Sequence, residues 1–98
     1  MAEKGEDQFF DVLLRTLNYS IEFVDDPSYA SLRFMDLFSS LLELQPFIGE
    51  FSRKEFYGRV RDKIKDRQLI RDPATRPKLQ TEILQMFIDE WRADTTRK

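Results

Sequence analysis

The sequence predicts an all-α protein, folded as a compact four-helix bundle-like domain with short loops. Three observations carry this prediction. Glycine and proline are scarce, with three and four residues among 98. Apolar residues recur every three or four positions, which is the period of an amphipathic helix, and they do not alternate as they would along a strand. A chain of this length has room for one hydrophobic core, so we expect a single domain over residues 1–98.

The first two helices are expected at residues 8–24 and 28–45. The first should stop at the turn-forming segment Asp25-Asp26-Pro27. Ser28 suits the N-cap of the second helix, because its hydroxyl can accept a hydrogen bond from a free backbone N–H. Pro46 should end that helix, since proline disfavours the helical conformation of the residue before it.

The third helix is expected at residues 53–67, and its start carries the clearest local signal. Ser52 followed by Glu55 has the spacing of a capping box, and Phe51 could pack on Phe56 as a hydrophobic staple. The basic residues of 59–67 fall on every second position, which on a strand would form one basic face. The start signal at Ser52 and the lack of a partner strand favour the helix.

The fourth helix is expected at residues 77–93, after a connection that contains two prolines. Pro77 suits the first helical position, where its missing N–H costs nothing. Residues 1–6 and 94–98 are expected to be frayed, as chain ends commonly are.

Three of the four predicted helices have apolar faces wider than a small monomer needs. The helix at 8–24 carries a second apolar face beside its core stripe. Helix 28–45 could use its width by lying centrally among the others, or part of the apolar surface could be an interface, since monomers rarely expose large apolar patches. We expect a homodimer or a protein partner. The candidate interface residues are Phe9, Val12, Tyr19 and Phe23.

Charge is divided unevenly along the chain. Residues 1–52 carry three cations and ten acids, whereas residues 53–78 carry ten cations and four acids. Such a basic segment raises the possibility of a nucleic-acid partner. The candidate phosphate contacts are Arg59, Arg61, Lys63, Lys65, Arg67 and Arg71, with Arg76 and Lys78 beyond them.

The helical arrangement of these charges favours a different explanation. Glu55, Asp62 and Asp66 would share the side of the third helix opposite its apolar stripe, and they would repel phosphates there. The cations would lie on the two flanks. An electrostatic match between the basic segment and the acidic first half, within one chain or between two, accounts for the division more simply.

The chain contains neither cysteine nor histidine. This removes the thiolate nucleophile, the usual general base and the commonest metal ligands. We therefore predict that the protein is not an enzyme and has no catalytic, cofactor-binding or metal-binding residues. No apolar run approaches the roughly 20 residues of a membrane span, and the acidic start is unlike a signal peptide, so we expect a cytoplasmic protein without a membrane partner.

One segment resembles a known family. Asp26-Pro27-Ser28-Tyr29 with Arg33, followed by Met35-Asp36-Leu37, is similar to a family of small all-helical bacterial and archaeal domains of unknown function. The resemblance implies a compact helical fold and brings no catalytic motif. The sequence thus favours a non-catalytic helical protein that acts through self-association or protein–protein interaction, with nucleic-acid binding through 53–78 as the alternative.

Overall fold

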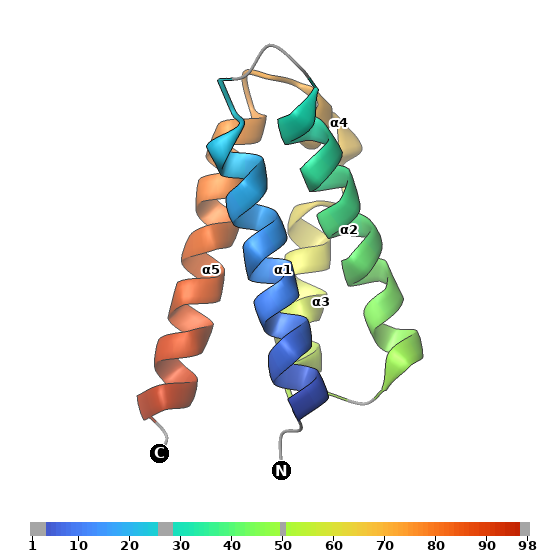
Figure 1. Ribbon diagram of the computed structural model, residues 1–98, viewed down its shortest axis with the longest axis vertical. Coiled ribbons are helices and arrows are strands. Elements are labelled where there is room, and N and C mark those ends of the chain that lie inside the picture. Colours follow the sequence, from blue (N-terminus) through green and yellow to red (C-terminus); the bar gives the residue numbers. More distant parts are fainter. Residues whose placement is uncertain (1–3, 26–28, 50, 97–98) are drawn as a thin grey trace.

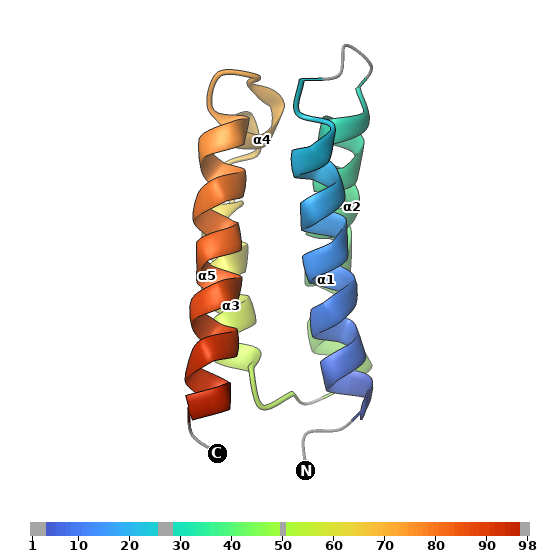
Figure 2. The same ribbon diagram turned by 60° about the vertical axis from the view of Figure 1, so that its left-hand side comes forward.

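The protein is all-α throughout the residues that the structure describes, a computed structural model covering 4–25, 29–49 and 51–96. Figure 2 shows two layers of helices, α1 with α2 and α3 with α5, and the described chain begins and ends at the same end of the bundle. The short helix α4 lies at the opposite end (Figure 1). The elements are α1 (Lys4–Glu22), α2 (Ala30–Ile48), α3 (Lys54–Lys63), α4 (Arg67–Arg71) and α5 (Arg76–Thr96).

The core lies between the two layers and is rich in aromatic rings. Phe87 of α5 is fully buried, and its ring centroid lies 4.9 Å from that of Phe56 in α3 and 5.9 Å from that of Phe38 in α2. Phe10 of α1 completes the group at 5.1 Å from Phe87. Because each ring comes from a different helix, this cluster joins both layers, and burial of such large side chains supplies most of the stability.

A buried polar layer joins three helices near the α1–α2 connection. The Nε2 of Gln80 in α5 donates to the hydroxyls of Ser20 in α1 and Ser31 in α2, at 3.0 and 3.1 Å. The Ser31 hydroxyl in turn donates to the Ser20 carbonyl at 2.7 Å. A buried amide without hydrogen-bond partners would lower the stability of the fold by the free energy of its desolvation. These bonds therefore hold Ser20, Ser31 and Gln80 at the same level along the bundle.

The predicted end of the second helix at Pro46 is wrong, because α2 continues through this residue to Ile48. Proline has no N–H with which to bond the carbonyl four residues earlier, here that of Leu42. The guanidinium of Arg61 in α3 donates to this carbonyl instead, at 3.2 Å. The helix ends at Gly49, whose φ of 155° is a conformation that favours glycine. The predicted N-cap, Ser28, lies outside the described residues.

The predicted capping box at the third helix is also replaced by a contact from elsewhere in the chain. No side chain of Ser52 or Arg53 caps α3. The carboxylate of Glu6 in α1 does so, accepting hydrogen bonds from the backbone N–H groups of Ser52 at 3.2 Å and Arg53 at 2.8 Å. Phe51 packs on Phe9 and Tyr57, with centroids 5.5 and 6.2 Å apart, so these rings take the place of the expected staple.

Helix boundaries differ from prediction elsewhere as well. Helix α1 ends at Glu22, two residues before the predicted end at residue 24. The third helix stops at Lys63, and the expected connection contains α4, whose N-cap Asp66 accepts a hydrogen bond from the Gln68 N–H at 3.0 Å. The segment expected to fray at the start is helical from Lys4, because Glu6 ties it to α3. Helix α5 begins at Arg76 and runs to Thr96, past the predicted end at residue 93.

Candidate interaction surface

Aromatic side chains connect α1 and α2 on the outer side of their layer. Phe34 of α2 stacks on Phe23 with an interplanar angle of 15° and a centroid distance of 5.8 Å. The ring of Tyr19 lies 5.4 Å from the same Phe34. Tyr19 is exposed, and both phenylalanines are only partly covered. These three rings therefore reach the surface and are not part of the buried cluster between the layers.

A stripe of apolar residues continues from Phe34 along α2. Its members are separated by three or four residues alternately, which places them on one side of the helix. Leu37, Leu44 and Ile48 are each about half exposed, at 49%, 47% and 48%. Leu41 lies between them and is partly buried against the core. The stripe consists of Phe34, Leu37, Leu41, Leu44 and Ile48.

This stripe and the apolar residues of the α1 segment beside it make up the surface that we call the α1–α2 face. The α1 contribution also follows helical spacing and includes Val12, which is exposed. Arg15 lies between Val12 and Tyr19 at the same helical spacing and pairs with Asp11 at 2.7 Å. Figure 1 shows α1 and α2 side by side, and Phe34 contacts Tyr19 and Phe23 across them. The α1–α2 face consists of Val12, Tyr19, Phe23, Phe34, Leu37, Leu41, Leu44 and Ile48.

The structure places the four predicted interface residues in two different environments. Val12, Tyr19 and Phe23 lie on the α1–α2 face. Phe9 does not, because it is buried inside the chain, where its ring meets Tyr57 edge to face at 5.5 Å. The α2 half of the face was not singled out from the sequence. Its sequence signal is the regular spacing from Phe34 to Ile48. The core residues of the same helix have a similar spacing, so the sequence alone does not separate the two sets.

Three of the six predicted nucleic-acid contacts pair with acids of the same chain: Arg59 with Glu90 at 3.7 Å, and the two described next. Arg67 lies 3.6 Å from Asp36 and 3.4 Å from Glu43, both in α2. Lys63 pairs with Glu82 at 3.5 Å, in α5.

The remaining predicted contacts differ in their surroundings. Arg61 is bound to the Leu42 carbonyl and to Gln45 Oε1, at 3.2 and 3.0 Å. Lys65 and Arg71 are exposed. The predicted contacts therefore fall into three groups: paired with acids, bound to a carbonyl and an amide, and exposed. The electrostatic match expected from the sequence occurs within one chain, and α5 contributes to it as well as the acidic first half.

A buried cluster of charged residues joins the start of α1, the start of α3 and the end of α5. Arg53 is almost fully buried and pairs with Glu90 at 3.5 Å and Asp7 at 3.6 Å, while its guanidinium lies 4.5 Å from the centre of the Phe10 ring. Glu6, at 2% exposure, accepts hydrogen bonds from the neighbouring backbone and from the Ser52 hydroxyl at 3.0 Å. Each charge in the cluster has partners, as buried charges require, so the arrangement is explained by the packing of the three helices.

Tyr57 lies beside this cluster, and the pKa of its phenol is shifted by its surroundings. Its side chain is fully buried, and its hydroxyl has no hydrogen-bond partner among the described residues. Burial raises the pKa of the Tyr57 phenol far above its ordinary value, because the ionised form would lose its hydration. A phenol that keeps its proton so firmly is a poor general base.

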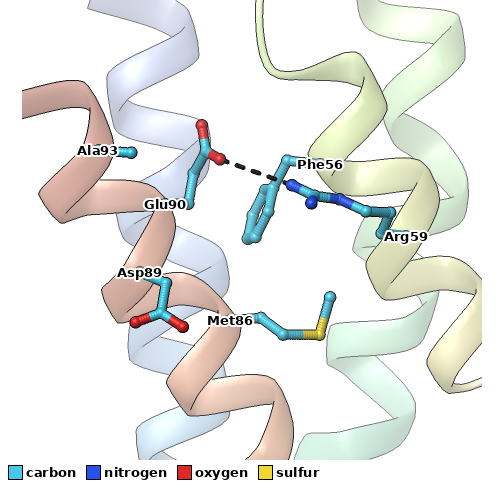
Figure 3. A pocket seen from close by; sticks show the side chains of 6 residues that line it. All are labelled: Phe56, Arg59, Met86, Asp89, Glu90 and Ala93. Atoms are coloured by element: carbon cyan, nitrogen blue, oxygen red, sulfur yellow. Dashed lines mark ion pairs between the residues drawn. The ribbon is translucent and has the colours of Figure 1, made fainter. Parts of the chain in front are cut away.

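A shallow hollow of about 360 Å³ lies between α3 and α5 (Figure 3). Phe56 and Met86 form its apolar wall, and Asp89 lies on the α5 side. Arg59 reaches across to Glu90 at 3.7 Å, the ion pair drawn in Figure 3. The hollow contains no nucleophile other than carboxylates, and its cation is already paired. Its geometry indicates no particular ligand.

Metal binding and membrane insertion would each require particular features of the described residues. No group of three or more potential metal-ligating side chains is found among them. None of their helices is long and apolar enough to cross a membrane.

Comparison with family models, with curated proteins and with solved structures gives no match to this chain.

Proposed function

We propose that this chain acts through protein–protein association at the α1–α2 face and has no catalytic role. The observation that carries the proposal is the regularly spaced stripe on α2, in which three large aliphatic side chains remain about half exposed. Burying apolar surface stabilises a protein by about 25 cal/mol per Å², and surface left in water does not contribute this free energy. Monomers rarely expose apolar patches of this kind.

The central-helix explanation does not account for the width of α2. Its inner side packs on α1, α3 and α4, and the stripe still remains on the surface. A knobs-into-holes contact with another helix would cover it, since alternating separations of three and four residues are the spacing of such seams. The lack of histidine and cysteine supports the non-catalytic part of the proposal.

Nucleic-acid binding is the weaker candidate. Phosphates would have to displace Asp36 and Glu43 from Arg67, and Glu82 from Lys63. Arg61 is occupied by a carbonyl and an amide of α2. No observation in the structure favours this function over association.

The test is a double variant, Leu37→Asp with Leu44→Asp, that places two charges in the face. Both positions are about half exposed, so the variant should fold, which circular dichroism verifies. Immobilised wild-type chain should retain a protein, either its own purified copy or another from an extract, and the variant should retain at least about tenfold less. Asn18→Asp is the control, because it adds a charge at an exposed position that is not part of the α1–α2 face.

A wild-type chain that retains no more protein than the double variant would contradict the proposal. Equal loss in Asn18→Asp would also contradict it, because the effect would then come from net charge alone.

A further inference from the structure

A small hollow of about 210 Å³ lies where α2 meets the end of α3 and the start of α4. Three cations and one carboxylate border it, so its lining carries a net positive charge. The lining consists of Ser39, Glu43, Arg61, Ile64, Lys65 and Arg67, all outside the α1–α2 face. We propose that this hollow binds one tetrahedral dianion, which is either inorganic phosphate or the phosphoryl group of a small phosphate ester.

Arg61 provides a guanidinium that is held in place by neutral groups. Its Nη1 donates to the Leu42 carbonyl at 3.2 Å and to Gln45 Oε1 at 3.0 Å. These bonds fix the guanidinium without neutralising its charge, whereas Lys63 and Arg67 each pair with a carboxylate. A partly buried charge gains more from a counterion than a fully exposed one does. Because both bonds use Nη1, the donors of Nη2 and Nε are left for a ligand.

Ser39 brings a hydroxyl to the same hollow from α2. The residue is 2% exposed and still borders the hollow. Within the described part of the chain, no hydrogen bond joins this hydroxyl to another residue. Buried polar groups are normally hydrogen-bonded, so the hydroxyl needs a partner that the chain itself does not supply. An oxyanion in the hollow would accept this bond.

Lys65 and Arg67 border the hollow from the connection between α3 and α4. Arg67 is already paired with Glu43 at 3.4 Å, and this pair can stay intact when an anion enters beside it. Lys65 is exposed and adds a second positive charge to that of Arg61. The carbonyls at the end of α3 would repel an anion, but they accept hydrogen bonds from the backbone of the turn that follows.

The charge and size of the hollow favour phosphate over other anions. Since Arg67 and Glu43 offset each other, Arg61 and Lys65 leave two positive charges, and a phosphate monoester carries about 1.5 to 2 negative charges at pH 7. Donors from three chain segments suit the several oxygens of a tetrahedral ion better than the two oxygens of a carboxylate. Sites for drug-sized ligands begin at about 300 Å³, so this smaller hollow fits a single anionic group.

Titration of the isotope-labelled chain with sodium phosphate, followed by NMR of the backbone amides, tests the site. Salt at about 0.1 M should be present, because it screens exposed charges beyond about 10 Å. Saturable shifts are expected around Ser39, Ile64 and Lys65. Acetate should bind at least about tenfold more weakly than phosphate. Equal binding of acetate, or no saturable shift with phosphate, would overturn the proposal.

Glycerol phosphate in a second titration distinguishes the two sources of the dianion. Tighter binding of the ester than of inorganic phosphate would assign the phosphoryl group of a small molecule. Tighter binding of inorganic phosphate would assign the free ion. Either result supports the site, provided that the shifts occur at the same amides.

Three substitutions test the residues of the site. Lys65→Gln and Ser39→Ala should each raise the dissociation constant of phosphate about three- to tenfold. Arg61→Met should abolish detectable binding, and the other two variants decide the matter if loss of its bonds to α2 disturbs the fold. Lys54→Gln is the matched control, because Lys54 is an exposed lysine of α3 that borders a different hollow beside Arg61. It should change the dissociation constant less than about twofold.

A loss of binding in Lys54→Gln but not in Lys65→Gln would place the anion in that other hollow and overturn the proposal. The site is also separable from the proposed function. Leu37→Asp with Leu44→Asp should bind phosphate as the wild type does, because neither residue borders the hollow. Failure of association at the α1–α2 face would therefore leave the anion site standing, and the reverse also holds.

Discussion

Glu6 shows how one buried side chain can determine where a distant helix begins. It comes from the start of α1, yet its carboxylate accepts hydrogen bonds from the backbone of Ser52 and Arg53, the first free N–H groups before α3. The negative charge also suits the positive end of the helix dipole. Ser52 with Glu55 is a local signal for this start, but a local signal cannot reveal a partner 46 residues away.

Glu6→Gln should lower the free energy of unfolding by about 1–3 kcal/mol, because the new amide group would face N–H donors that need an acceptor. Asp11→Asn is the matched control, since Asp11 is exposed and only pairs with Arg15 one turn away. Urea unfolding at one fixed protein concentration measures both. Equal effects for the two variants would show that Glu6 caps nothing.

Tyr57 illustrates a polar group for which the structure provides no partner. Its ring lies in the core. The unpartnered hydroxyl was beyond prediction, because it depends on how the rings of Phe9, Phe51 and Phe56 close around it.

Tyr57→Phe should leave the free energy of unfolding at pH 7 unchanged or raise it by up to about 2 kcal/mol, since it removes an unsatisfied buried group. The folded phenol keeps its proton, whereas the unfolded one ionises above about pH 10. Ionisation of Tyr57 therefore leaves the free energy of unfolding unchanged below pH 10. Above pH 10 this free energy falls, because the unfolded phenol releases its proton while the folded one keeps it. Above pH 10 the wild type should lose up to about 1.4 kcal/mol per pH unit more than Tyr57→Phe.

Tyr29→Phe is the control for this comparison, because Tyr29 is exposed. Chemical denaturation from pH 7 to 11 supplies the values. Parallel pH profiles for wild type and Tyr57→Phe would contradict the assignment.

At the scale of elements, Pro46 and Arg61 form one unit although they belong to different helices. Proline leaves the Leu42 carbonyl without its usual donor, and the guanidinium of Arg61 supplies one. The sequence predicted that Pro46 ends the helix because the rule for proline is local. The rescue by α3 is a tertiary contact, and so the end of α2 could not be placed from sequence alone.

A double-mutant cycle tests this unit. Arg61→Met should cost more stability in the natural chain than in a Pro46→Ala background, where the new alanine N–H can bond the Leu42 carbonyl. The expected coupling is about 1 kcal/mol, measured as the difference in free energy of unfolding. Lys65→Met provides the matched control, because Lys65 is an exposed cation of the same segment. Additive effects of Arg61→Met and Pro46→Ala would contradict the unit.

At the scale of the whole molecule, the fold class was predictable because the helical period runs through most of the chain. The uneven division of charge was equally visible in the sequence. The structure adds which charges pair: Arg67 with acids of α2, and Lys63 with an acid of α5. The candidate site was predictable only in part. Val12, Tyr19 and Phe23 could be assigned to a second apolar face, but separating the exposed stripe of α2 from its core residues requires knowing which side α3 and α4 cover.

The mass of the chain in solution tests most directly whether the α1–α2 face is an interface between copies. Sedimentation equilibrium over a micromolar dilution series should give twice the single-chain mass of 11.8 kDa for the wild type. Leu37→Asp with Leu44→Asp should return the mass to that of one chain. A wild-type mass of 11.8 kDa across the whole series, identical to that of the variant, would contradict an interface between copies.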